Sequence, residues 1–265
     1  MSSSRGLDTP LVPRGGSTSD HHPVVEPGDV STRSLRSRLD NQDAGVETQG
    51  ATPYAAVLWD MDGTLVDTEP YWMATEHELA ERHGGTWTQQ DSLNLVGNDL
   101  LESGRYIREH MGIDLEPAEI VEQLLDGVIE QIRVAVPWRP GAVELLADLA
   151  GAGVPCALVT MSYRRFVEPI LDGLPDETFA AVVTGDAVER GKPYPDPYLK
   201  AARLLGVAPA DCLAIEDSNT GARSAETAGC AVLCVPNHVP ILEGERRTFA
   251  DSLAGLTAAN LPVLP

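Results

Sequence analysis

The sequence is short of positive charge. Its 265 residues hold 19 lysine and arginine side chains against 40 aspartate and glutamate side chains, for a formal net charge of −21. Proteins that bind nucleic acid need a basic face, and proteins that dock on anionic lipid use basic residues in the same way. The composition therefore argues against nucleic acid and against an anionic membrane surface as partners. Only two of the basic residues are lysines, Lys192 and Lys200.

Long apolar runs and recognisable cysteine motifs are also missing. No stretch approaches about 18 consecutive apolar residues, so we expect no transmembrane helix, and the polar N-terminus lacks the apolar segment of a secretory signal. The four cysteines lie in or beside short apolar runs, and their spacing matches no zinc-binding pattern. They are Cys156, Cys212, Cys230 and Cys234. We interpret them as buried thiols in a reducing compartment and expect a cytoplasmic protein.

Residues 1–52 differ in composition from the rest of the chain. They are rich in Ser, Gly, Pro, Asp and Arg and show no apolar period. Such a segment cannot bury enough apolar surface to offset the entropy lost on ordering. Residues 11–15 (LVPRG) are similar to a protease-cleavage site left from recombinant expression. We predict a disordered N-terminal extension over 1–52 that includes a remnant of an expression tag.

From residue 53 onward, short apolar runs alternate with helical patterns. Continuous apolar runs of this length are typical of strands buried on both faces. The runs lie at 55–59, 156–159, 180–183, 213–215 and 231–235. The helical patterns of the same region lie at 140–151, 163–171, 196–205 and 219–228. This alternation predicts the α/β class, with a Rossmann-like and mainly parallel sheet.

One long segment interrupts the alternation. About 95 residues separate the first apolar run from the second, far more than a strand–helix crossover requires. Helical patterns fill the segment near 69–83, 88–96, 99–110 and 117–135. We therefore predict an all-helical cap at 68–136, connected by two hinge strands near 66–70 and 136–140. The core domain would then consist of 53–67 and 137–265.

Two carboxylates follow the first apolar run, in the segment Asp60-Met61-Asp62-Gly63-Thr64. In extended backbone, residues i and i+2 point the same way, so Asp60 and Asp62 can face one site. Gly63 lets the backbone turn and brings its N–H groups close to an anion. Two like charges this close favour a bound cation, and oxygen ligands suit Mg²⁺.

Three further polar signals lie where later apolar runs end. Thr160 is placed to donate a hydroxyl hydrogen bond to an anion, helped by the N–H groups that follow it. Lys192, before Pro193, indicates that a compact ammonium is required in a chain that otherwise uses arginine. Glu216 and Asp217 form a second acidic pair. Each signal alone also fits helix capping or a surface lysine. Because open α/β sheets bind ligands at the carboxyl ends of their strands, the four signals together predict one active site.

These motifs, in this order, resemble those of the haloacid dehalogenase superfamily. The resemblance covers 54–240 and is to the capped subfamily I branch, which contains phosphatases and β-phosphoglucomutase-like enzymes. It implies that Asp60 is the nucleophile, which forms an aspartyl-phosphate, and that Asp62 is the acid–base group. It also implies that Lys192 neutralises phosphoryl oxygens.

The resemblance further implies the contacts to phosphate and metal. Thr160, with the backbone amides of Gly63 and Met161, would bind the phosphate, and Ser162 would lie beside them. The resemblance implies Mg²⁺ held by Asp60, the backbone carbonyl of Asp62 and Asp217, with Glu216 acting through water or a neighbouring ligand. In the cap, Gly97 and Asn98 are the expected substrate contacts, with Glu69 and Trp72 as further candidates.

Within this superfamily we expect a Mg²⁺-dependent phosphatase that hydrolyses phosphate monoesters of a small metabolite, sugar phosphates included. Haloacid dehalogenation would not require Asp62, and phosphonate cleavage uses a cap lysine, whereas 68–136 contains none. A β-phosphoglucomutase-like sugar-phosphate mutase is the main alternative. The cap His and Arg of that relative fall near Trp72 and Leu100 here, which favours hydrolysis. A catalytically inactive binding protein would lack a catalytic carboxylate, and none is missing. A monomer is expected.

Overall fold

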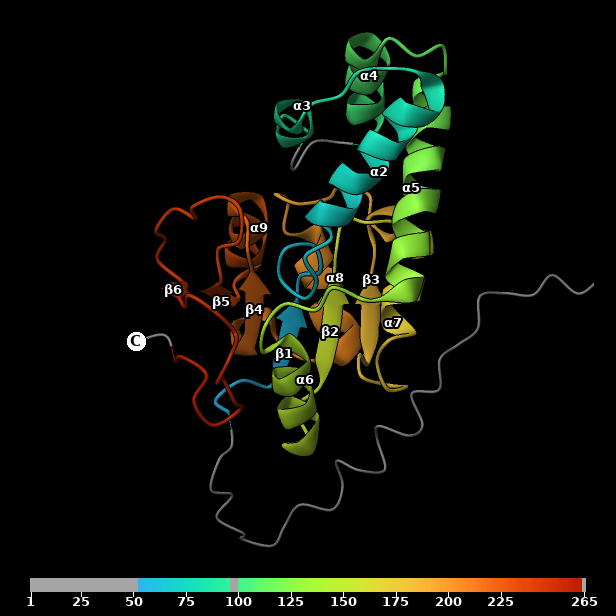
Figure 1. Cartoon of the computed structure of the whole chain (residues 1–265). Helices are drawn as coiled ribbons and strands as arrows, with labels where there is room; N and C mark the ends of the chain where they lie inside the picture. Colours follow the sequence, from blue (N-terminus) through green and yellow to red (C-terminus); the bar gives the residue numbers. More distant parts are fainter. Residues whose placement is uncertain (1–51, 96–99, 264–265) are drawn as a thin grey trace, which may run out of the picture. The chain divides into compact units, whose positions relative to one another are not determined.

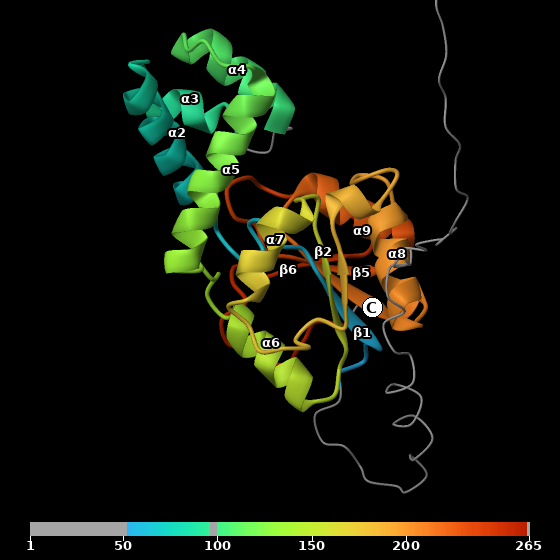
Figure 2. The ribbon, with the colours of Figure 1, turned by 90° about the vertical axis from the view of Figure 1, so that its right-hand side faces the viewer.

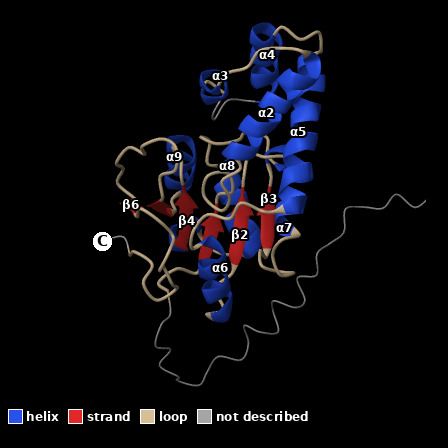
Figure 3. Ribbon diagram, in the orientation of Figure 1, coloured by secondary structure: helices blue, strands red, loops and turns tan. Residues whose placement is uncertain are grey.

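The computed structural model describes residues 52–95 and 100–263. Six parallel strands form one sheet in the order β3-β2-β1-β4-β5-β6, and Figure 3 shows the arrows of β2, β3 and β4 pointing the same way. The strands are β1 (Ala56–Trp59), β2 (Cys156–Val159), β3 (Ala181–Val183), β4 (Cys212–Glu216), β5 (Ala231–Cys234) and β6 (Arg247–Phe249). The predicted α/β class with a Rossmann-like parallel sheet is confirmed. Strand β6 was not predicted, because its Arg-Thr-Phe sequence contains no apolar run.

Helices cover both faces of this sheet. They are α6 (Ala142–Gly151), α7 (Arg164–Leu171), α8 (Asp196–Leu205) and α9 (Asn219–Ala228). Side chains alternate across a strand, so Val57 and Trp59 of β1 pack in the cluster that includes residues of α6 and α7. Ala56 and Leu58 pack on the other face, in the cluster that includes residues of α8 and α9. Figure 2 shows the two helix layers on either side of the strands.

Four helices lie between β1 and α6 in the sequence (Figure 1). They are α2 (Glu69–His83), α3 (Gln89–Leu93), α4 (Leu100–Met111) and α5 (Pro117–Val134). Leu79, Ile107 and Ile120 belong to a hydrophobic cluster formed within these helices. Helix α3 is shorter than the expected 88–96. It starts after a capping box formed by Thr88 and Asp91, and Asn94 caps its end.

The two segments that lead into and out of these helices lie side by side. The amide of Asp67 donates to the carbonyl of Pro137 at 2.9 Å, and the amide of Arg139 donates to the carbonyl of Leu65 at 2.9 Å. Between these two bonds, Val66 forms an antiparallel bridge with Trp138. This short paired region overlaps the expected hinge strands near 66–70 and 136–140, but Glu69 and Pro70 already belong to α2, so the first strand ends earlier than expected.

Two sequence predictions concern segments that the structure describes only in part. The predicted extension over 1–52 lies outside the described residues, except for Thr52. For the described part of the chain, no helix combines the length and the apolar composition needed to cross a bilayer.

Candidate active site

Three neighbouring strands bring the polar motifs together. Asp60 follows β1, Thr160 follows β2, and Glu216 is the last residue of β4. Because β1 lies between β2 and β4 and all three are parallel, their carboxyl ends meet at one edge of the sheet. The site predicted from motifs far apart in sequence is therefore assembled by sheet order.

Lys192 connects the acidic residues of this edge. Its Nζ atom donates to Asp60 Oδ1 at 2.5 Å, to Glu216 Oε1 at 2.7 Å and to the carbonyl of Val159 at 2.9 Å. Burial on its own would lower the pKa of this ammonium, but the charges of Asp60 and Glu216 outweigh that effect and hold the pKa above its ordinary value. Lys192 is therefore a fixed positive charge whose three hydrogen-bond donors are all in use.

Glu216 is completely buried and is held by donors on both oxygens. Oε1 accepts from Lys192 and from the Tyr198 hydroxyl at 2.5 Å, while Oε2 accepts from the Ser218 hydroxyl at 3.2 Å. A Cβ at Gly221 would lie 1.9 Å from Oε1, so the first turn of α9 packs directly against the carboxylate. Tyr198 was not identified from sequence, because a tyrosine in a helix gives no signal that separates it from a core aromatic residue.

Asp217 lies against the turn that follows β1. A Cβ at Gly63 would come within 1.9 Å of Asp217 Oδ2, and Gly63 has a φ of 86°. Burial, followed by the charges of Asp60 and Glu216, raises the pKa of Asp217 to about 8. Gly63 is thus required both for its backbone conformation and for the space that Asp217 occupies.

The carboxylates form a group that fits a hard divalent cation. Asp60, Glu216 and Asp217 each offer an oxygen, and these oxygens lie within 4.8 Å of one another. Asp60 Oδ2 is buried and accepts no hydrogen bond from the described residues. A group of carboxylate oxygens in which one buried oxygen has no hydrogen-bond partner suits Mg²⁺ as a ligand set. Because both oxygens of Glu216 are already hydrogen-bonded, Asp60 and Asp217 are the better direct ligands.

Asp62 is oriented by hydroxyl groups from two segments, the turn before α2 and the loop after β2. Its Oδ2 accepts from Ser162 at 2.7 Å and from Thr160 at 3.3 Å, and its Oδ1 accepts from Thr68 at 3.3 Å. Burial and the charge of Asp60 raise the pKa of Asp62 to about 6. The Thr160 hydroxyl also accepts from the amide of Ser162 at 2.9 Å.

The backbone differs from the expectation for Gly63. Its N–H donates to the carbonyl of Val66 at 2.7 Å, since the chain folds back on itself in this turn. The amides of Met61 and Asp62 donate no hydrogen bond to another residue in the described ranges. These two N–H groups, together with that of Met161, are therefore better placed to bind an anion than the N–H of Gly63. The amide of Met61 could not be identified from sequence, because a backbone donor is independent of residue type.

The remaining candidates separate into two groups. Gly97 and Asn98 lie outside the described residues. Trp72 is partly buried and packs on Phe166, with ring centroids 5.6 Å apart.

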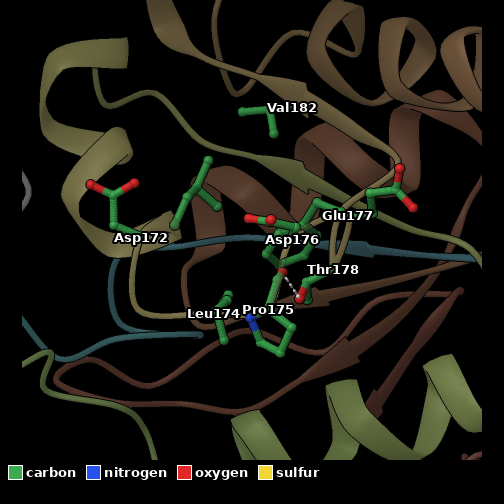
Figure 4. Close-up of a pocket in the computed structure, with 9 residues that line it drawn as sticks. Asp172, Leu174, Pro175, Asp176, Glu177, Thr178 and Val182 are labelled. Atoms are coloured by element: carbon green, nitrogen blue, oxygen red, sulfur yellow. Dashed lines mark hydrogen bonds between the residues drawn. The ribbon is translucent and has the colours of Figure 1, made fainter. Parts of the chain in front are cut away.

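The surface pocket in Figure 4, with a volume of about 270 Å³, is lined by residues of the α7–β3 connection such as Pro175 and Thr178. It contains none of the predicted site residues, so we assign the site to the strand ends.

Comparisons with known proteins show the family of this chain. A sequence model of a family described as haloacid dehalogenase-like hydrolase matches residues 54–229. Hexitol phosphatase A of Escherichia coli (strain K12) is 37% identical over 77% of this chain and 94% of its own length. The bifunctional riboflavin kinase/FMN phosphatase of Arabidopsis thaliana is 33% identical over 69% of this chain, which spans 48% of that relative. The crystal structure of CbbY from Rhodobacter sphaeroides in complex with xylulose-(1,5)bisphosphate matches with a TM-score of 0.67 and 28% identity, over 78% of this chain and 100% of that one.

Proposed function

Because the chain belongs to the haloacid dehalogenase-like hydrolases, we propose that it is a Mg²⁺-dependent phosphatase that cleaves phosphate monoesters of small metabolites by way of an aspartyl-phosphate. The observation that carries the proposal is the convergence of Asp60, Lys192 and Asp217 at the strand ends. Curated relatives named as phosphatases of hexitols, fructose 1-phosphate and phosphoglycolate support the reaction class.

Asp60 is the proposed nucleophile. Lys192 holds Oδ1 at 2.5 Å, whereas Oδ2 has no partner in the described part of the protein. A carboxylate oxygen attacks phosphorus, the bond to the leaving alkoxide breaks, and the phosphoryl group is transferred to Asp60. The ammonium of Lys192 offsets negative charge beside the reacting group throughout, which is the main way in which proteins assist phosphoryl transfer.

Asp62 is the proposed acid–base group. Ser162, Thr160 and Thr68 orient its carboxyl group. In the first step it gives a proton to the leaving alkoxide, which departs as an alcohol. In the second step it accepts a proton from water, which attacks phosphorus and releases Asp60 and inorganic phosphate. The amides of Met61, Asp62 and Met161 would bind the phosphoryl oxygens.

The metal residues follow from the donor set. Asp60, Asp217 and the backbone carbonyl of Asp62 would hold Mg²⁺, with Glu216 fixing the surrounding hydrogen bonds. When bound, the ion offsets the charge of the phosphoryl group and of the crowded carboxylates.

Helices α2 to α5 are the proposed cap, with residues 53–67 and 137–265 as the core. The paired linkers of these helices, residues 65–67 and 137–139, would act as the hinge. Closure of such a cap excludes water and places substrate contacts over the site. Trp72, which packs on Phe166, lies near the position where β-phosphoglucomutases carry a cap histidine, and this supports hydrolysis over transfer between sugars.

The proposal is tested by phosphate release from p-nitrophenyl phosphate and from a panel of sugar phosphates. We expect release that requires Mg²⁺, stops with EDTA and is abolished in Asp60→Asn. If a bisphosphate activator produces isomerised sugar phosphate instead of inorganic phosphate, the enzyme is a mutase. Phosphate release that persists in Asp60→Asn would contradict the proposed nucleophile.

A further inference from the structure

Glu69 is an acidic side chain at the edge of the proposed active site. It opens α2, two residues after Asp67, and its side chain is only partly buried. No residue of the described ranges donates a hydrogen bond to it. The charges of His238, Glu76, Asp67 and Asp62 all act on it, so it lies within electrostatic reach of the proposed acid–base group. A carboxylate withdrawn from bulk water without donors is stabilised when a ligand supplies them.

Several cationic groups of the hinge, the cap and the loop that carries His238 already have partners. His238 Nε2 lies 3.1 Å from Asp67 Oδ1. Arg139, in the hinge, donates to Asn237 Oδ1 at 2.6 Å. The proposed cap contains no lysine, and two of its arginines pair within the cap, Arg82 with Gln123 and Arg108 with Glu116. The described residues around Glu69 therefore offer a hydrogen-bond acceptor and net negative charge.

An apolar surface lies beside this acceptor. Trp72 is three residues after Glu69 on α2, and residues at this spacing share one helix face. Its ring packs on Phe166 of α7, which fixes the indole in place. A polar acceptor next to an aromatic wall suits a ligand that combines hydroxyl groups with a carbon backbone.

We infer that Glu69 determines specificity for the leaving group: its carboxylate accepts hydrogen bonds from hydroxyls of a neutral polyhydroxylated chain and repels a leaving group with a second negative charge. The substrate class is then a polyol or sugar monophosphate, in preference to phosphorylated carboxylic acids or bisphosphates. This inference rests on the proposed function, because it requires the phosphoryl group to lie at Asp60.

The test compares three probes that differ only in what leaves with the phosphate. Sorbitol 6-phosphate offers hydroxyls, 2-phosphoglycolate offers a carboxylate, and p-nitrophenyl phosphate offers neither. The variants are Glu69→Ala and Glu69→Gln. The matched control is Glu78→Gln, on the exposed side of the same helix. Melting temperatures establish that each variant folds.

We expect the wild-type kcat/KM to be higher for sorbitol 6-phosphate than for 2-phosphoglycolate. Glu69→Ala should lower the value for sorbitol 6-phosphate about 10- to 100-fold, mainly through KM, since hydrogen bonds to a charged group are lost. The value for p-nitrophenyl phosphate should stay within about twofold, because the phosphoryl contacts are unchanged. In Glu69→Gln, which removes the repulsion, turnover of 2-phosphoglycolate should rise. Glu78→Gln should match the wild type.

Two results would overturn the inference. One is a wild-type preference for 2-phosphoglycolate. The other is an equal loss on all three probes in a Glu69 variant that melts like the wild type, which would make the role structural. Failure of the proposed function has a different signature, because the wild type with Mg²⁺ would then release no phosphate even from p-nitrophenyl phosphate, and both proposals would fall.

Discussion

At the scale of single residues, the site depends on one buried positive charge among four carboxylates. The Lys192 side chain is 5% exposed and pairs with Asp60 and Glu216. Removing one partner from a buried charged group leaves the others uncompensated, which typically destabilises a protein by about 3–5 kcal/mol. Lys192 therefore serves stability and the proposed chemistry through the same contacts.

Lys192→Ala should lose activity by about 100-fold or more, because charge stabilisation of the phosphoryl group is removed. The only other lysine of the chain provides the control: Lys200 donates to the carbonyl of Ala187, so Lys200→Ala should keep its activity. The measurement is kcat with p-nitrophenyl phosphate, together with urea unfolding. Near-normal kcat in Lys192→Ala would contradict the assigned role.

Comparing Gly63→Ala with Gly84→Ala distinguishes the cost of backbone strain from damage to the proposed metal site. Both Gly63 and Gly84 have positive φ, 86° and 68°, so alanine at either position should cost about 1–2 kcal/mol of stability. Only at Gly63 would the new Cβ collide with Asp217, whereas nothing lies within 4 Å at Gly84. We expect Gly63→Ala to weaken activation by Mg²⁺ and Gly84→Ala to retain it. Equal Mg²⁺ titrations of the two variants would show that Asp217 is not a ligand.

Glu69 should make stability depend on pH. Burial raises the pKa of this carboxyl group from 4.5 to about 7, so between these values the folded protein binds more protons than the unfolded chain. The contribution of Glu69 to stability is therefore present at acidic pH and falls as the pH rises through about 7. The melting temperature of Glu69→Gln minus that of the wild type should increase between pH 5 and pH 8. If this difference instead decreases as the pH rises, the predicted direction of the pH effect is wrong.

At the scale of elements, burial of the central strands explains the cysteines. All four are buried, and burial raises the pKa of each thiol to about 12. Thiolates are the reactive form, so the folded protein should react slowly with Ellman's reagent at pH 8, and four thiols should appear in denaturant. Rapid labelling of the native protein at that pH would show that the strands open locally.

The elements also show what the sequence could predict. The central strands and their helices were recognisable because apolar runs and helical periodicity report burial directly. Strand β6 and the end of α3 depend on pairing and capping, which a local pattern expresses weakly. In the site, charged side chains at strand ends were identified, whereas Tyr198 and the amide of Met61 were not. Their roles arise from packing and from backbone geometry, which residue type does not encode.

An ion-pair group links α5 to α7. Arg165 of α7 donates to Glu122 and Asp126, which lie one turn apart on α5. All three side chains are substantially exposed, so the pairs should contribute about 1 kcal/mol or less and be screened by salt. Arg165→Ala should lower the melting temperature slightly at low ionic strength and less in 0.5 M salt, where the Debye length falls to about 4 Å. A large loss that is independent of salt would indicate a packing role instead.

At the scale of the molecule, one basic side chain acts against a strongly acidic background. The net charge of −21 opposes the approach of an anionic substrate. Binding therefore depends on local groups: Lys192, free amides in the turns after β1 and β2, and the bound cation proposed for Asp60 and Asp217. The parallel sheet is what concentrates them, since its strand order places β1 between the two strands that supply the other motifs.

The central claim is that Asp60 carries the phosphoryl group during turnover. Its most direct test is mass spectrometry of enzyme quenched in acid while it hydrolyses substrate with Mg²⁺. The account predicts a phosphoryl increment on the peptide that contains Asp60, absent from Asp60→Asn and from enzyme treated with EDTA. Full turnover with no labelled enzyme, or a phosphoryl group on another residue, would contradict it.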